Sequence, residues 1–313
     1  MSGPLPVLAF ERTPPDDVAA QLEGVVEVVD SASRSLRRAN GTIVGAGRWD
    51  KARFAEAPEL RVLSRTGIGV DSVDLVEATA RGVMVTNTPD GPTVSTAEHA
   101  LTLMLAIAKR LPVAQRRLRE GSGDYVARND GIELDGLTLG LVGYGRIGRR
   151  LAAAAMGLGM YVRVYDPYTT IDDAEPAASL DDLLADADVV SLHLPLTQET
   201  AQLLDRRAFA TMRAGALLVN TARGGLVDQD ALIEALDRGQ LAGAALDVTD
   251  PEPLPTEHPL LARDDVIVTP HIASSTRVGK RRMFVMAVEQ ALTALRGERP
   301  NHLVNVDVIP RGG

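Results

Sequence analysis

The sequence predicts an α/β protein built on a doubly wound parallel sheet, with a second α/β domain beside it. Short apolar runs of strand length alternate with helical patterns along most of the chain. A strand, a glycine-rich turn and a helix follow one another between residues 137 and 156. The chain has 313 residues, which is more than one hydrophobic core ordinarily organises. Together these observations favour two α/β domains.

The first part of the chain predicts a small, flavodoxin-like parallel sheet with helices on its faces. Strands are expected at residues 7–10, 25–29, 42–44, 60–63 and 83–85. Helices are expected between them at residues 15–22, 51–57 and 72–80. Alternation of this kind is typical of strands joined by helical crossovers.

One connection in this part is rich in glycine. The segment 65–71, Arg-Thr-Gly-Ile-Gly-Val-Asp, lies between an expected strand and an expected helix. Backbone N–H groups in such a turn can bind a small anion such as a carboxylate. A tight strand-to-helix connection would use the same residues, and this stretch alone does not separate the two interpretations.

A long apolar helix is expected at residues 95–111. Its start fits a capping box, in which Ser95 and Glu98 satisfy the first N–H groups. Glu98 and His99 are therefore interpreted as polar groups of the first turn. Because the helix is apolar on more than one side, it should be buried between domains or against a second subunit. This predicts a homodimer formed through residues 95–111.

Residues 137–148 predict a dinucleotide-binding turn. An apolar strand is followed by three glycines at the GxGxxG spacing, and a helix is expected directly after them, at Gly143, Gly145 and Gly148. The glycines let the backbone approach a pyrophosphate, and the new helix directs its N–H groups and positive dipole end at it.

An acidic residue strengthens this interpretation. The next expected strand, 161–165, ends in Asp166, eighteen residues after Gly148. A carboxylate there can accept hydrogen bonds from an adenosine ribose, and it would repel the 2′-phosphate of NADP. An ordinary glycine-rich turn does not explain an acid at this distance. The sequence therefore predicts a Rossmann-type domain with NAD as cofactor.

Strand and helix patterns then alternate to the end of the chain. Strands are expected at residues 189–194, 216–220, 243–248, 266–268 and, finally, 304–306. Helices are expected at residues 181–185, 206–212, 228–238 and 277–296. We expect an NAD-binding domain over residues 97–289 and a discontinuous substrate domain formed by residues 1–96 and 290–313.

Composition excludes several classes of function. The net charge of −9 argues against a nucleic-acid partner. No apolar stretch is long enough to span a membrane, and the first residues do not resemble a signal peptide. The chain has no cysteine, hence no disulfides and no thiolate metal site. We expect a cytoplasmic protein without a metal.

Three polar residues follow expected strands on the cofactor edge of the second sheet, namely Arg223, Glu252 and His271. An arginine among small residues can present its planar fork to a carboxylate. Each residue also has an ordinary interpretation: a surface ion pair for Arg223, a solvated acid for Glu252, a structural histidine for His271. All three at one edge are harder to explain in that way.

These stretches resemble the D-isomer-specific 2-hydroxyacid dehydrogenase family, which includes phosphoglycerate dehydrogenases and hydroxypyruvate/glyoxylate reductases. The resemblance covers about residues 60–280. Its motifs are RTGIGVD at 65–71, STAEH at 95–99, GYGRIG at 143–148, YDP at 165–167, HLPLT at 193–197, NTARGG at 220–225, ALDV at 245–248 and TPHIA at 269–273.

The resemblance implies hydride transfer between NAD(H) and a small D-2-hydroxy acid or 2-oxo acid. It implies that His271 is the acid/base paired to Glu252, and that Arg223 orients the substrate. Backbone N–H groups of Ile68 and Gly69 would hold the substrate's carboxylate. The implied cofactor contacts, besides the three glycines, are Thr96, Arg146, Ile147, Asp166, Pro195, Thr200, Thr221 and Asp247.

Two questions stay open from the sequence. The first is the substrate: Arg48 and Arg65 could meet a phosphate, whereas Gly45-Ala46-Gly47 stands where phosphoglycerate dehydrogenases usually carry an arginine. The second is whether the chain is an enzyme, because non-catalytic, NAD(H)-sensing corepressors share this fold. The presence of Arg223, Glu252 and His271 favours the enzyme.

Overall fold

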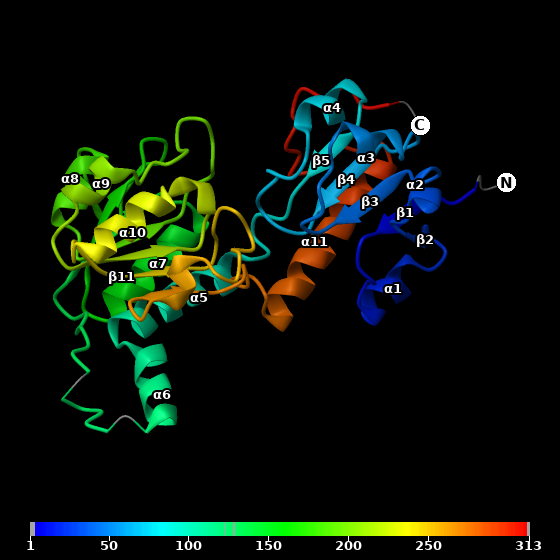
Figure 1. Cartoon of the computed structure of the whole chain (residues 1–313). Helices are drawn as coiled ribbons and strands as arrows, with labels where there is room; N and C mark the ends of the chain where they lie inside the picture. Colours follow the sequence, from blue (N-terminus) through cyan, green and yellow to red (C-terminus); the bar gives the residue numbers. More distant parts are fainter. Residues whose placement is uncertain (1–3, 122, 128, 312–313) are drawn as a thin grey trace. The chain divides into compact units, whose positions relative to one another are not determined.

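The computed structural model describes residues 4–121, 123–127 and 129–311, and the chain forms two compact units (Figure 1). The first unit contains the residues up to Pro92 and those from Thr276 onward. The second unit contains Thr93–Ser275. Among the described residues, no helix is both long and apolar enough to span a membrane.

The first unit is built on a five-stranded parallel sheet in the order β2-β1-β3-β4-β5. Its strands are β1 (Val7–Phe10), β2 (Glu27–Asp30), β3 (Gly41–Val44), β4 (Val62–Arg65) and β5 (Met84–Thr86). Its helices are α1 (Asp16–Leu22), α2 (Ser33–Leu36), α3 (Lys51–Ala55), α4 (Leu75–Ala80) and α11 (Arg277–Leu295). This strand order is that of flavodoxin-like folds, as the sequence predicted.

Separate apolar clusters cover the two faces of this sheet. On one face, Trp49 and Phe54 pack edge to face, with ring centroids 5.3 Å apart, near Leu63 and Ala78. Both aromatic residues are buried, so they belong to the core. On the other face, α1 and α11 bury side chains including Val18, Ala287 and Ala291 against the sheet.

The predicted domain boundary near residue 289 is wrong, because α11 belongs wholly to the first unit. Its buried residues Ala287, Val288, Ala291 and Ala294 belong to one apolar cluster on the sheet, and a boundary at residue 289 would divide that cluster. The predicted strand at 304–306 is also absent. Leu303 makes a single antiparallel bridge to Thr86. Instead, the side chain of Asn305 accepts from Val85 N at 2.8 Å.

The second unit is built on a seven-stranded parallel sheet in the order β12-β11-β10-β9-β6-β7-β8. Its strands are β6 (Thr138–Val142), β7 (Tyr161–Tyr165), β8 (Glu175–Pro176), β9 (Val189–Leu192), β10 (Ala216–Asn220), β11 (Leu241–Leu246) and β12 (Val266–Val268). The strand order reverses between β6 and β9. In doubly wound sheets, ligands bind at the carboxyl ends of the strands near such a switch point.

Helices cover both faces of this sheet. Its helices are α5 (Thr93–Ala108), α6 (Leu111–Glu120), α7 (Arg146–Gly157), α8 (Leu180–Asp186), α9 (Arg206–Thr211) and α10 (Gln229–Asp237), with 3-10 turns η1 (Gly224–Leu226) and η2 (Pro259–Ala262). Buried residues of α5 and α7 share one apolar cluster, and those of α8, α9 and α10 share another. This two-faced burial confirms the predicted Rossmann-type domain.

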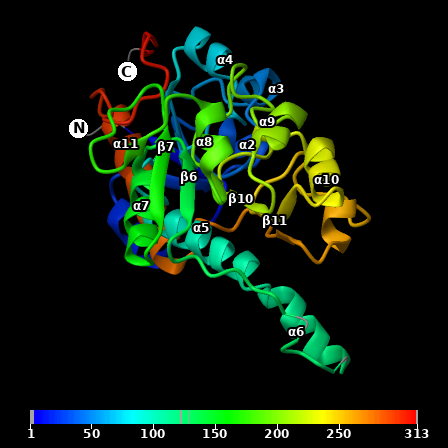
Figure 2. The same ribbon diagram turned by 90° about the vertical axis from the view of Figure 1, so that its left-hand side faces the viewer.

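The helix predicted at 95–111 begins earlier and ends sooner than expected. Ser95 lies inside α5 rather than at its cap, since the helix begins at Thr93. Arg110 adopts a left-handed conformation (φ 53°) and separates α5 from α6. Pro112 explains the break between the two helices, because a proline is tolerated in the first turn of a helix but not in its interior. The sequence did not predict α6, which extends away from the sheet of its unit (Figures 1 and 2).

Candidate active site

The glycine turn connects β6 to α7 as the sequence predicted. Gly143 has φ +95°, and a Cβ there would overlap the carbonyl group of His193. A Cβ at Gly148 would overlap the carbonyl oxygen of Gly143. Around Gly145, in contrast, a Cβ would meet nothing within 4 Å. No side chain caps the start of α7, so an anion can approach the helix N-terminus across an open turn.

Asp166 lies at the end of β7 beside this turn. One carboxylate oxygen accepts from Tyr144 N at 2.8 Å, and the other accepts from Tyr168 N at 2.9 Å. The two backbone contacts fix the carboxylate next to the glycine turn. Each oxygen keeps a further lone pair with which it can accept from a ligand hydroxyl.

Tyr144, within the turn, is buried under the guanidinium of Arg149, whose central carbon lies 4.4 Å from the ring centroid. Its hydroxyl donates to Asp173 at 2.7 Å. Burial, followed by this hydrogen bond, raises the pKa of Tyr144 to about 12. The phenol therefore stays protonated and acts as a fixed donor.

Glu252 and His271 form a direct pair. His271 Nδ1 lies 2.6 Å from Glu252 Oε1, and both side chains are partly open to solvent. Since Nδ1 contacts the carboxylate, Nε2 is the ring nitrogen that can exchange a proton with a ligand. His271 has φ +51°, a strained conformation for a residue other than glycine.

Arg223 follows β10, the strand next to β11, and so belongs to the same sheet edge as Glu252 and His271. Asn220 Nδ2 donates to the Arg223 carbonyl at 2.8 Å, and Arg223 Nη1 donates to the Ala222 carbonyl at 2.6 Å. Gly224 is required beside it, because a Cβ there would overlap the backbone of Thr249. The close approach joins the ends of β10 and β11.

A buried carboxylate holds the His271 loop. Asp247 Oδ1 accepts from Thr269 Oγ1 at 2.5 Å and from Ile272 N at 2.9 Å, and Oδ2 accepts from Ala273 N at 2.8 Å. His99 Nε2 lies 3.3 Å from Oδ1. Burial raises the pKa of Asp247, but the hydrogen bonds from His99 and the loop outweigh it and keep the pKa below its usual value.

The remaining expected cofactor residues lie at the same edge of the sheet or near it. Thr200 Oγ1 donates to the Pro195 carbonyl at 2.8 Å, after β9. Thr221 Oγ1, after β10, is buried and has no hydrogen-bond partner in the structure. Thr96 is buried in α5, whereas Arg146 and Ile147 begin α7 with more exposure.

In the first unit, the glycine turn after β4 is held by hydrogen bonds to Asn87 and Thr88, which follow β5. Gly67 N donates to Thr88 Oγ1 at 2.8 Å, and Asn87 Nδ2 donates to the Ile68 carbonyl at 2.8 Å. Ile68 is exposed to solvent. The Gly69 segment follows at the carboxyl edge of this sheet.

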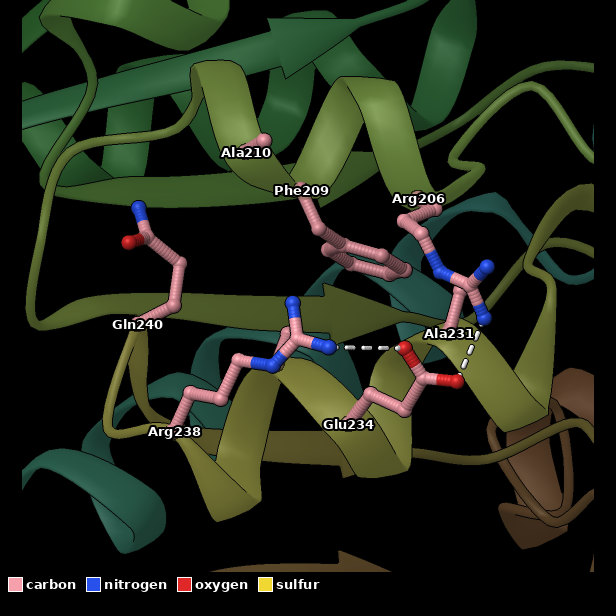
Figure 3. A pocket seen from close by; sticks show the side chains of 8 residues that line it. Arg206, Phe209, Ala210, Ala231, Glu234, Arg238 and Gln240 are labelled. Atoms are coloured by element: carbon pink, nitrogen blue, oxygen red, sulfur yellow. Dashed lines mark hydrogen bonds and ion pairs between the residues drawn. The ribbon is translucent and has the colours of Figure 1, made fainter.

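A small pocket elsewhere on the second unit lies between α9 and α10 (Figure 3). Phe209 is one of the residues that line it, and Glu234 pairs with both Arg206 and Arg238 at the same pocket. The pocket contains none of the expected site residues. Within the described ranges, no group of three or more His, Asp or Glu side chains is arranged to hold a metal ion.

Comparisons with known proteins show which family the chain resembles. The model of the D-isomer specific 2-hydroxyacid dehydrogenase, NAD binding domain, matches residues 101–273. The chain is 42% identical to a D-3-phosphoglycerate dehydrogenase of Archaeoglobus fulgidus over 257 residues, which is 81% of this chain and 49% of the relative. It is 41% identical to a glyoxylate reductase of Korarchaeum cryptofilum over 267 residues, 83% of this chain and 80% of the relative.

Among solved structures, the TT0316 protein of Thermus thermophilus is similar with a TM-score of 0.89 and 41% identity, covering 95% of this chain and 99% of that one. The chain spans about half the length of the curated phosphoglycerate dehydrogenases that it matches.

Proposed function

Since this chain belongs to the D-isomer-specific 2-hydroxyacid dehydrogenase family, we propose that it transfers hydride between NAD(H) and a small D-2-hydroxy acid or 2-oxo acid. The contact of 2.6 Å between His271 and Glu252, at the carboxyl edge of a sheet with a dinucleotide turn, carries the proposal. A proton donor oriented by a carboxylate is what carbonyl reduction requires.

The second unit is the NAD-binding domain in this proposal, and its residues fit the cofactor. Gly143, Gly145 and Gly148 leave room for the pyrophosphate at the uncapped start of α7, with Arg146 and Ile147 beside it. Asp166 would accept hydrogen bonds from the adenosine ribose. The buried hydroxyl of Thr221 has no hydrogen-bond partner in the protein, and a bound cofactor would supply one.

NADH supplies the hydride, and the protein supplies a proton and electrostatic stabilisation. His271 donates from Nε2 to the substrate's carbonyl oxygen as negative charge builds there, while Glu252 holds the ring. Arg223 presents its guanidinium to the same oxygen and to the carboxylate, which fixes the substrate's orientation. In the oxidative direction His271 accepts the proton.

The first unit is the substrate domain in this proposal. Backbone N–H groups of Ile68 and Gly69 hold the substrate's carboxylate, since the turn is exposed and anchored by Thr88 and Asn87. The last part of the chain, including α11, completes this domain.

We also propose a homodimer and a cytoplasmic location. Helix α5 buries Ala100, Leu103 and Met104 in its own unit, so the predicted contact through residues 95–111 relies on its partly exposed face. The projecting α6 adds exposed apolar residues next to it, Leu111 and Leu118. A molar mass of two chains in multi-angle light scattering would support the dimer, and a monomer at micromolar concentration would contradict it.

The decisive experiment is a panel of 2-oxo acids, with NADH oxidation followed at 340 nm. It includes glyoxylate, hydroxypyruvate and 3-phosphohydroxypyruvate, each with NADH and NADPH. Turnover of at least one 2-oxo acid would support the proposed dehydrogenase activity. NADH binding without turnover of any acid would favour the NAD(H)-sensing alternative instead.

A further inference from the structure

The loop that carries His271 needs external support. A left-handed conformation at a residue other than glycine costs free energy and persists only when the surrounding contacts impose it. Here His271 N donates to the Asp247 carbonyl at 2.8 Å, while the Asp247 carboxylate accepts from Ile272 N and Ala273 N. The position of one buried carboxylate therefore determines the backbone of the acid/base loop.

His99 reaches this carboxylate from a distant part of the chain. Its Nε2 lies 3.1 Å from Thr269 Oγ1 and 3.3 Å from Asp247 Oδ1. The hydroxyl of Thr269 has one hydrogen, which it donates to Asp247 at 2.5 Å. His99 Nε2 must then carry a hydrogen and donate it to one or both oxygens.

This arrangement closes a ring of three side chains behind the loop. The side chain of Asp247 is fully buried and that of His99 is 18% exposed, so water can replace the imidazole donor only in part. A buried carboxylate that loses a donor shifts toward other partners or toward solvent. Such a shift would move the N–H groups of Ile272 and Ala273, and with them the ring of His271.

We propose that His99 is a positioning residue, which holds the His271 loop in its active conformation through Thr269 and Asp247. It acts through these residues and not on the substrate. The inference rests on the proposed function for its kinetic consequence, but the structural consequence, a rigid loop at 269–273, does not depend on it.

Two substitutions separate the donor from the bulk of the side chain. His99→Leu removes the N–H group, whereas His99→Gln places an amide N–H close to the position of Nε2. His302→Leu, which removes an imidazole from the first unit, is the matched control. We expect His99→Leu to lower kcat roughly 10- to 100-fold, the scale of a small misplacement of a catalytic group. KM and the NADH dissociation constant should stay within about threefold, and His99→Gln should recover most of kcat.

Hydrogen exchange tests the same inference without activity. The amides of Ile272 and Ala273 should exchange at least about tenfold faster in His99→Leu, and near the wild-type rate in His99→Gln and in the control. Unchanged exchange and unchanged kcat in folded His99→Leu would overturn the proposal. So would a His99→Gln variant as impaired as His99→Leu. Should His99→Leu fail to fold, Thr269→Val breaks the same ring and must accelerate the same two amides.

A wild-type protein without turnover of any oxo acid would overturn the proposed function alone. The exchange experiment would still decide whether His99 holds the loop.

Discussion

The Nδ1 atom of His271 lies 2.6 Å from Oε1 of Glu252, nineteen residues earlier in the chain. The two residues follow adjacent strands, β11 and β12, whose parallel pairing brings their carboxyl ends together. The sheet therefore orients the imidazole, and Nε2 is the nitrogen that can serve a substrate. This relationship defines what each partner should contribute.

Replacement of His271 by alanine should abolish turnover and leave NADH binding intact. General acid catalysis contributes about 10²- to 10⁴-fold, and His271 is the residue that Glu252 orients for this role. Steady-state kinetics gives the loss in kcat, and quenching of protein fluorescence or enhanced NADH fluorescence gives binding. Turnover at the wild-type rate would refute the assignment of His271.

Glu252→Gln should reduce turnover less than His271→Ala does. The amide oxygen can still accept from Nδ1, but the negative charge that stabilises a protonated ring is lost. We expect kcat to fall roughly 10-fold, with KM for the oxo acid little changed. Glu257→Gln, in the same segment but without a contact to His271, is the control. Equal kcat in both variants would mean that the pairing has no catalytic role.

The strand ends could be predicted from the sequence because local patterns specify them. Apolar runs followed within three residues by Asp166, Arg223 or His271 place these residues at one edge of a parallel sheet, whatever the exact element boundaries. The contact of His99 could not be predicted, since 170 residues separate it from Thr269. Only the packing of α5 on the sheet brings the two together.

The other misses have local causes. Helix α6 has the polar, charged composition of a loop, so its sequence does not predict a helix. It is separate from α5 because Arg110 adopts a left-handed conformation between them. The strand expected at 304–306 has strand-like residues, but Asn305 uses its side chain in place of a backbone ladder. Pattern alone does not distinguish these outcomes.

Asp166 should make the protein selective for NADH over NADPH. Its carboxylate is fixed by Tyr144 N and Tyr168 N, so it cannot easily turn away from a 2′-phosphate. Asp166→Ser should lower the ratio of kcat/KM with NADH to kcat/KM with NADPH by about 10- to 100-fold. This factor corresponds to the free energy of one charged hydrogen bond. Because the substitution also removes two backbone contacts, the melting temperature is measured alongside. A wild-type preference for NADPH would contradict this role of Asp166.

His193 should make the folded state sensitive to mild acid. Burial lowers the pKa of His193 to about 4, whereas the unfolded chain binds this proton near pH 6.5. Between these values the unfolded state holds more protons, so the free energy of unfolding falls as the pH falls from 6.5 toward 4. The loss is at most about 3 kcal/mol, an upper bound because the residue as a whole is only partly buried.

Urea denaturation at pH 7.5 and pH 4.5 measures this effect. His193→Gln keeps an amide within reach of Ser191, which contacts Nε2 at 2.8 Å, and does not titrate. Between pH 7.5 and pH 4.5, the free energy of unfolding of the variant should fall by about 2 kcal/mol less than that of the wild type. The low pKa of Asp247 acts in the same direction, but its stabilisation is lost only below about pH 4, outside the measured range. Parallel losses in both proteins would rule out His193 as the source.

Glu11 should decide whether a second anionic group is accepted at the substrate domain. Its carboxylate accepts from Gly45 N, and a Cβ at Gly47 would overlap it, so it occupies the turn after β3. That turn adjoins β4, which leads into the glycine turn at Ile68 and Gly69. We expect a substrate whose carboxylate binds there to direct its far end along this edge, where Glu11 presents a negative charge.

Neutralising this charge should therefore favour a phosphorylated substrate. In Glu11→Gln, kcat/KM for 3-phosphohydroxypyruvate should rise about 5- to 10-fold relative to hydroxypyruvate, as expected for removing one like charge at a solvated site. Glu23→Gln, at the far end of α1, is the control for a general change in net charge. The effect should shrink at high ionic strength, because salt screens exposed charges. An unchanged ratio of the two substrates in Glu11→Gln would show that the turn after β3 does not face the distal end of the substrate.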